Sequence, residues 1–361
     1  MASSGSAPAD EPAGPADGAA TDTERVKAYA RDAGADLVGI ADADVVEANP
    51  PDPNHPQVPS RIWEAAESIV VIGIRTPLGE FLSDDHHCIG YVNQLVVHQI
   101  DRLSHRLARF IEDALDERAL QLANDETDPE LKRGSYGFLS LRHLAAEAGL
   151  GTFGLEANLL TPEYGPRVYF GAALTTAELE PDDRLTHQLC IGESCGRCLK
   201  ACPSDAIEHF HLDKVDCASA AQYQGARSII YGPLRAAAAL EDPDDVLAML
   251  DTGEVREKYL SIVRKINAFG ACPRCVEVCP IGVDYSKFLA QEHKHIPEHT
   301  PEKEAKLQEM LTAREAGEFV EWNKPVNERW IGEDGYKPFM QLLREREEAA
   351  ETGQRPGGDA S

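Results

Sequence analysis

The sequence has few basic residues for its size. It contains 35 Lys and Arg against 62 Asp and Glu, which gives a formal charge of −27 over 361 residues. Such a negative field repels phosphate backbones, so we do not expect nucleic acid among the partners of this chain. The same composition also suits a solvated surface in a salty cytoplasm, where it carries no information about partners.

Long apolar runs are also missing. A membrane-spanning helix needs roughly 20 apolar residues, whereas the longest candidate, SIVVIGI at 68–74, has the length of a buried strand. The N-terminus MASSGSAPADEPAGPADGAATDTE has neither an apolar core flanked by basic residues nor a twin arginine. It is therefore predicted to be a disordered acidic tail and not an export signal. These absences favour a cytoplasmic protein without a membrane partner.

Helix and strand patterns alternate along the first half of the chain. The stretch DTERVKAYARDAGADLVGIADAD predicts a capped helix, a stop at Gly34 and a strand from Asp36 to Ala41. SIVVIGI predicts a second strand and 93–118 a long amphipathic helix. A shorter helix then ends at glycines 149 and 151, and VYFGAALTT predicts a strand. This alternation of helices and strands indicates an α/β domain.

The pattern as a whole predicts an α+β protein. Its expected parts are an acidic tail (1–22), an α/β domain (23–185), a cysteine-bearing domain (186–292), a charged helical C-terminal extension (293–346) and a disordered tail (347–361). The only internal repeat is a cysteine pattern, which occurs twice in the third part.

The chain has only nine cysteines, and seven of them fall into two groups. The groups are Cys190-x4-Cys195-x2-Cys198-x3-Cys202-Pro and Cys272-x2-Cys275-x3-Cys279-Pro, with Cys217 between them and Cys88 far upstream. Both groups end in C-x3-C-P, the iron–sulfur signature of bacterial ferredoxins, in which the last cysteine of each run serves the other cluster. A zinc ribbon binds its metal with two C-x2-C pairs. It does not need the last cysteine of each run, which serves the other cluster, or the proline after it. A chain of this length needs no disulfide for stability, and a reducing cytoplasm disfavours one.

Eight cysteines suffice for two 4Fe–4S clusters in a ferredoxin-like domain. The predicted ligand sets are Cys190, Cys195, Cys198 and Cys279 for one cluster, and Cys202, Cys217, Cys272 and Cys275 for the other. The gap after Cys190 is four residues where the pattern has two, so either Cys190 ligates through a longer loop or that corner of the cluster is looser. We expect ligation, because only Cys88 would otherwise be spare.

The stretch before the cysteines, SLRHLAAEAGLGTFGLEANLLTPEYGPRVYFGAALTTAELEPD, resembles the corresponding segment of epoxyqueuosine reductases and reductive dehalogenases. The similarity extends over roughly residues 23–290. It implies that the N-terminal domain is of the cobalamin-binding type, that electrons pass through the two clusters to the corrinoid, and that the reduced cobalt acts on the substrate. The cofactor contacts implied by the resemblance are Gly149, Gly151, Gly154, Asn158, Tyr164, Gly165 and Arg167.

The chain departs from epoxyqueuosine reductases at the proton donor. Those enzymes carry an Asp-Thr-Gly-Pro element before the glycine run, where this chain has RGSYGFLSLRH. Tyr136 or His143 is the candidate acid in its place. The alternatives are that Tyr136 is a packed aromatic beside a glycine turn and that His143 only caps or packs its helix.

These observations favour an iron–sulfur, corrinoid-dependent oxidoreductase that cleaves a small organic substrate reductively, as reductive dehalogenases do. One alternative is a tRNA-modifying enzyme of the epoxyqueuosine reductase type. A second is a non-catalytic 4Fe–4S electron-transfer protein that serves a partner enzyme. In each case we expect an external electron donor such as ferredoxin or flavodoxin.

Overall fold

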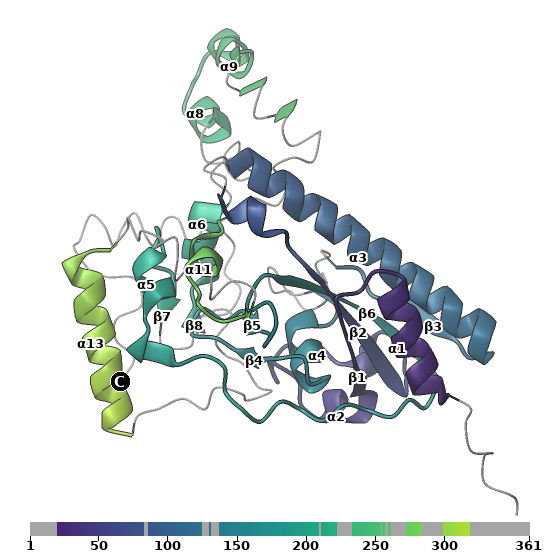
Figure 1. Ribbon diagram of the computed structural model, residues 1–361. Helices are drawn as coiled ribbons and strands as arrows, with labels where there is room; N and C mark the ends of the chain where they lie inside the picture. Colours follow the sequence, from purple (N-terminus) through teal and green to yellow (C-terminus); the bar gives the residue numbers. More distant parts are fainter. Residues whose placement is uncertain are drawn as a thin grey trace, which may run out of the picture.

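The computed structural model describes ten stretches of the chain. They are residues 20–82, 86–124, 130, 137–208, 211–221, 233–253, 255–256, 259–260, 272–283 and 299–317, and at 82, 86–88, 211, 214–215 and 218–219 only the backbone is described. Figure 1 shows a sheet flanked by helices at one side of the molecule and the short cysteine-bearing helices at the other.

The centre of the N-terminal part is a four-stranded antiparallel sheet with the order β1-β2-β6-β3. Its strands are β1 (Leu37–Asp42), β2 (Ser68–Arg75), β6 (Val168–Thr175) and β3 (Ala119–Gln121). In the register of the ladder, Val70 pairs with Ile40 on one side and with Ala173 on the other. β2 is buried from Ser68 to Ile74, which explains its continuous apolar run and confirms the strand predicted there.

Helices cover both faces of this sheet. α1 (Asp22–Asp32) and α3 (His86–Leu115) pack on one face, where Val70 and Ile72 point. α4 (Leu141–Glu147) and α2 (Ala43–Ala48) lie on the other face, against Ile69 and Val71. Successive strand residues thus serve opposite cores, as the twofold period of a strand requires.

The predicted elements of this part are present, with two differences. The long helix starts at His86, before the predicted Asn93, because the buried Ile89 extends its apolar stripe toward the N-terminus. The alternation of helix and strand predicted an α/β domain, yet every strand pairing in the described residues is antiparallel. The arrangement is therefore a mixed sheet-and-helix layer of the α+β kind.

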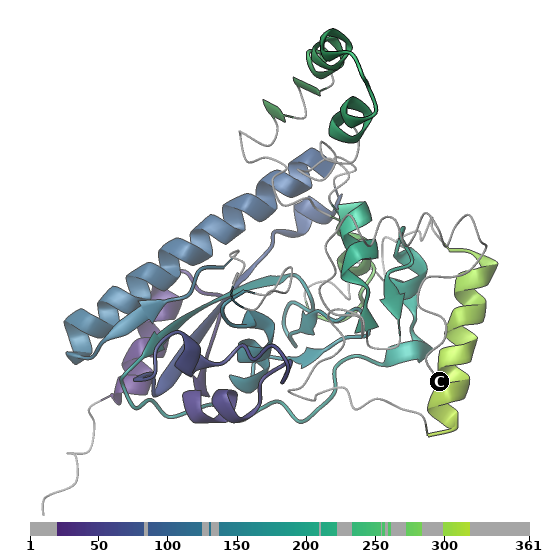
Figure 2. The same ribbon diagram turned by 180° about the vertical axis from the view of Figure 1, so that it is seen from behind.

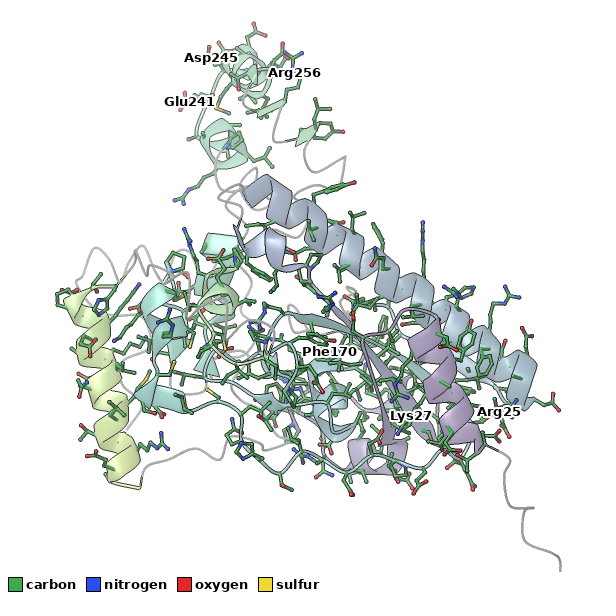
Figure 3. All side chains as sticks on the ribbon, in the orientation of Figure 1. Arg25, Lys27, Phe170, Glu241, Asp245 and Arg256 are labelled. Atoms are coloured by element: carbon green, nitrogen blue, oxygen red, sulfur yellow. The ribbon has the colours of Figure 1, made fainter. Side chains whose placement is uncertain are left out.

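A short hairpin connects the sheet to the cysteine-bearing part. It consists of β4 (Thr152–Phe153) and β5 (Leu159–Leu160). The segment that follows β6 contacts this hairpin again at β4. On the way this segment is tied to the sheet, because Asp182 accepts hydrogen bonds from Lys27 Nζ at 2.6 Å and from the Ile40 amide at 2.8 Å. Figure 3 labels Lys27 on α1, next to this segment.

The cysteine-bearing part is made of short elements. They are η4 (Gly192–Ser194), α5 (Arg197–Ala201), β7 (Ile207–Glu208), β8 (His211–Leu212), α6 (Lys214–Ala221), α11 (Arg274–Glu277) and α13 (Pro301–Glu315). α13 confirms the helix predicted in the charged C-terminal extension, whose part beyond residue 317 lies outside the described residues.

Two further helices, α8 (Arg235–Ala238) and α9 (Pro243–Leu250), stand apart from the body in Figures 1 and 2. The remaining short turns are η1 (Pro59–Arg61) and η2 (Leu78–Leu82). In the part of the chain that the structure describes, no helix combines the length and the apolarity needed to cross a bilayer.

Candidate functional site

Four cysteines from two distant motifs line one cavity. Cys190, Cys195 and Cys198 come from the first group and Cys279 from the second, and the cavity has about 320 Å³ of empty space when its open mouth is included. They are the four residues that the sequence assigned to one cluster. Within the described residues, no three His, Cys, Asp or Glu side chains form a group that would hold a single metal ion. The thiols surround a volume, as the ligands of a multi-iron cluster do.

Two left-handed glycines shape the loop that carries these thiols. Gly192 and Gly196 have φ values of +67° and +58°, which residues other than glycine rarely adopt. The turn at Gly192 directs its amide to Cys190 Sγ at 3.3 Å. Gly196 begins α5, which carries Cys198 on its buried side. The local sequence therefore aims both sulfur atoms and an N–H donor at the same cavity.

The other four cysteines also lie together. The pKa of the Cys272 thiol is raised to about 11, first by burial and also by the neighbouring Cys217 and Cys202. The pKa of Cys275 is likewise raised, first by burial, and also by Glu156 and by these three thiols. Cys202 Sγ accepts the Ala206 amide at 3.3 Å. These contacts group the thiols as the sequence predicted for the second cluster, and Figure 3 shows sulfur atoms gathered near α5 and α11.

The protonation of the thiols tests whether these residues fit a metal cluster. Burial raises the pKa of Cys190 to about 12 and the pKa values of Cys198 and Cys279 well above the ordinary value. Thiols so placed do not ionise without a compensating positive charge nearby. An iron–sulfur core supplies such charge to its thiolate ligands, so the two cysteine sets fit two clusters.

A buried carboxyl lies between the two cysteine sets. Glu156 is 2% exposed, and burial raises its pKa to about 7. Its charge raises the pKa values of Cys198 in the first set and of Cys275 in the second. Among the described residues its Oε1 has no hydrogen-bond partner. Glu156 was not predictable from the sequence, because a glutamate after GLGTFGL carries no spacing signal of its own.

A partly buried cation lies beside the second set. Arg142, on α4, donates from Nη1 to the Ala157 carbonyl at 3.0 Å and to Asn158 Oδ1 at 3.1 Å. Asn158 Nδ2 in turn faces Cys275 Sγ at 4.0 Å. Burial lowers the pKa of Arg142 to about 10, while Cys217 and Cys275 act in the opposite direction. The sequence analysis missed Arg142 as well.

The C-terminal helix α13 covers the first cysteine loop. Lys303 Nζ donates to the Cys202 carbonyl at 2.6 Å, and Leu307 lies against Gly196. Arg314 Nη1 pairs at 3.1 Å with Glu193, whose side chain is fully buried. The described part of the predicted C-terminal extension thus packs on η4 and α5, which carry the first cysteine set.

The glycines predicted to contact a corrinoid lie against protein. A methyl group at Gly149, which has a φ of +71°, would meet the Asp183 backbone, and one at Gly151 would meet the Leu160 backbone. The Glu156 carboxylate lies beside Gly154. In the described residues these glycines therefore permit close packing.

The other residues predicted to contact a corrinoid have protein partners too. Gly165, with a φ of +56°, lies against the Ile281 backbone, and Arg167 Nη2 donates to the Ile281 carbonyl at 3.1 Å. Arg167 is 1% exposed. The Tyr164 ring lies under the Arg75 guanidinium at 5.9 Å, and Asn158 bridges Arg142 and Cys275. These contacts join the sheet to the segment after Cys279, and the role of these residues toward a corrinoid stays a prediction.

The two candidate acids differ in what the structure describes of them. Tyr136 lies outside the described residues, as does the side chain of Cys88. His143 is 6% exposed, its Nδ1 is 2.6 Å from Ser140 Oγ, and its ring lies 4.6 Å from that of Phe153. Packing of this kind was the alternative for His143, and its role as an acid stays a prediction.

Comparison with known proteins bears on the family. No protein-family model matches the chain. Curated relatives include the epoxyqueuosine reductase of Synechococcus sp. (strain RCC307), 46% identical over 74 residues, which are 20% of this chain and 22% of the relative. The epoxyqueuosine reductase of Synechocystis sp. (strain ATCC 27184 / PCC 6803 / Kazusa) is 36% identical over 104 residues, 28% of this chain and 35% of the relative. The predicted resemblance to epoxyqueuosine reductases is confirmed. The matched segment spans about a fifth to a third of these relatives.

Solved structures give a wider set of similarities. The epoxyqueuosine reductase of Streptococcus thermophilus aligns with a TM-score of 0.42 and 19% identity, over 71% of this chain and 65% of that one. A catabolic reductive dehalogenase in complex with 3-bromo-4-hydroxybenzoic acid aligns with a TM-score of 0.47 and 15% identity, over 81% and 36%. Both families that the sequence resembles are thus represented, whereas the curated relatives described above are epoxyqueuosine reductases.

Proposed function

We propose that this chain is an iron–sulfur oxidoreductase of the epoxyqueuosine reductase type. The observation that carries the proposal is the cavity lined by Cys190, Cys195, Cys198 and Cys279, since cysteines from two distant motifs meet there as the crossed ferredoxin pattern requires. Cys202, Cys217, Cys272 and Cys275 would hold a second cluster. The names of the curated relatives favour epoxide reduction over dehalogenation.

This proposal changes the order of the functions expected from the sequence. Reductive cleavage of a small organic substrate, as in dehalogenases, becomes the second candidate. The expectation that nucleic acid is not a partner is also replaced. One epoxyqueuosine reductase has been solved with an epoxyqueuosine-modified tRNA stem loop, so a tRNA-borne epoxide is the first substrate class to test.

The residues of the site have definite tasks in such a reduction. Conversion of an epoxide to an alkene takes up two electrons and two protons and releases the oxygen as water. When bound, the clusters would supply single electrons. The chain holds the cysteine ligands in buried positions, directs the Gly192 and Ala206 amides at two sulfur atoms, and keeps Arg142 charged beside the second set.

Cobalamin remains a prediction from the resemblance. The glycines expected to contact it are packed against the Asp183, Leu160 and Ile281 backbones, so we assign no step to a corrinoid. Corrinoid bound after anaerobic reconstitution and gel filtration, measured by its visible absorbance, tests that prediction independently of the clusters.

The test of the proposal uses the full chain, purified and reconstituted without oxygen. We expect about eight irons per chain and, with a chemical reductant, loss of the epoxide from epoxyqueuosine-containing tRNA as followed by nucleoside mass spectrometry. A Cys198→Ser variant should lose iron and activity, whereas a Cys88→Ser variant should keep both. A chain that holds no iron overturns the proposal.

The assay also separates the alternatives. Turnover of a halogenated phenol but not of the tRNA would establish the dehalogenase-type candidate and refute ours. Clusters that take up electrons but reduce neither substrate would indicate an electron-transfer protein. Binding of the tRNA in gel shifts at low and high salt shows whether the negative surface charge excludes it.

A further inference from the structure

Arg142 contacts the turn 154–158, which faces the second cysteine set through Asn158. Its guanidinium donates to two acceptors in the turn 154–158, the carbonyl of Ala157 and Oδ1 of Asn158, at 3.0 and 3.1 Å. Ala157 has a φ of +61°, a conformation that costs roughly 1 kcal/mol or more for a residue with a side chain. The hydrogen bond to its carbonyl helps to hold that strained turn in place.

The same contact determines which way the Asn158 amide faces. A guanidinium has only donors, so the oxygen of Asn158 must face Arg142 and the NH2 group must face the other side. On that side lies Cys275 Sγ, 4.0 Å from Nδ2. Without Arg142, the amide would be free to turn its oxygen toward the sulfur and place two electron-rich atoms together.

The charge of Arg142 acts on the same cysteines. Its pKa, lowered to about 10 by burial, leaves it protonated at neutral pH, and Cys217 and Cys275 are the thiols that favour its charged form. A positive charge beside a cluster stabilises the state with one more electron, and N–H donors to the sulfurs act in the same direction. Arg274 also faces Cys272, whereas Arg167 and Arg197 lie by the first cavity.

We propose that Arg142 is a positioning residue that raises the reduction potential of the cluster held by Cys202, Cys217, Cys272 and Cys275, through its charge and through the orientation of Asn158. This inference rests on the proposed function, because it requires two bound clusters. It makes the second cluster the preferred holder of an electron that the chain has accepted. The effect on potential is separate from turnover, so it is measurable whatever the substrate.

The experiment is an anaerobic redox titration of the reconstituted full chain, followed by electron paramagnetic resonance. Arg142→Gln should lower the midpoint potential of one cluster only. At the ambient potential that half-reduces this cluster in the unaltered protein, its oxidised-to-reduced ratio should rise about tenfold, equal to about 59 mV for a one-electron couple. Arg142→Lys keeps the charge and should restore part of the shift. Arg109→Gln removes an equal charge from the exposed side of α3 and should change neither potential.

Asn158→Leu removes the amide and leaves Arg142 charged. It should lower the potential of the same cluster by less than Arg142→Gln does. If Arg142→Gln does not retain both clusters, the potential measured in Asn158→Leu tests the inference instead. Unchanged potentials in whichever of these variants retain both clusters would overturn the inference while the proposed function stands. An unaltered chain without iron would overturn the proposed function and this inference together.

Discussion

Replacing Gly196 with alanine should strain the first cysteine loop in two separable ways. Gly196 has a φ of +58°, and a left-handed conformation costs alanine about 1–2 kcal/mol. A methyl group there would also lie 2.5 Å from the Leu307 side chain of α13. Such overpacking costs about 1–3 kcal/mol. We therefore expect the free energy of unfolding to fall by about 2–5 kcal/mol in Gly196→Ala.

A second substitution separates the two contributions. Leu307 is 4% exposed, so Leu307→Ala alone should cost about 2–5 kcal/mol. In the double variant the new methyl group occupies the space that Leu307 vacates, and the overpacking of about 1–3 kcal/mol disappears. The double variant should thus be more stable than the sum of the single effects predicts, by that amount.

Urea denaturation under anaerobic conditions measures all four proteins of this cycle. Gly253→Ala is the control, because a methyl group at Gly253 meets no atom within 4 Å and its φ is not left-handed. Additivity within about 0.5 kcal/mol would refute the contact between α13 and the cysteine loop. Iron content of the same samples would show whether loosening that contact also releases the first cluster.

Two further predictions concern single side chains. Cys190→Ser should lower the iron content from about eight to about four to seven per chain with altered cluster spectra, and an unchanged count and spectrum would show that Cys190 is not a ligand. Glu80→Gln tests whether burial destabilises the ionised form of the Glu80 carboxyl. Burial raises the pKa of Glu80 from 4.5 to about 7. The favourable contribution of the protonated carboxyl to stability is therefore complete below pH 4.5 and is lost as the pH rises to about 7. The glutamine variant should match the unaltered protein near pH 4.5 and exceed its free energy of unfolding by about 2 kcal/mol at pH 8; an equal difference at both pH values in urea denaturation would exclude this cause.

Sequence periodicity predicted the elements whose formation is local. The run SIVVIGI and the apolar stripe of α3 each bury a face that is visible within a short window of residues, and both elements formed there. The order of the strands was not predictable in this way. β6 pairs antiparallel with β2 across almost a hundred residues of chain. No short window of the sequence contains both partners of that ladder.

The cysteine sets and their neighbours show the same division. Ligand spacing is a local property, so the members of the first cavity were predictable before the fold was known. Arg142 and Glu156 were not, since on SLRHLAAEAG the arginine has the place of an ordinary helix-surface residue. Its function follows from the turn 154–158, which brings Asn158 between Arg142 and Cys275, a contact between segments far apart in the sequence.

Lys303 gives the cysteine site an order of assembly. Its ammonium group binds the carbonyls of Cys202 and Lys200 at the end of α5, from a helix that the ribosome synthesises after all eight cysteines. Cys279 also follows the first group by a long interval. While the chain is still being synthesised, the first three thiols have neither Cys279 nor the contact with α13. Under the proposed function, the first cluster would therefore be completed only after translation has passed α13, or be held meanwhile by a scaffold that substitutes for both.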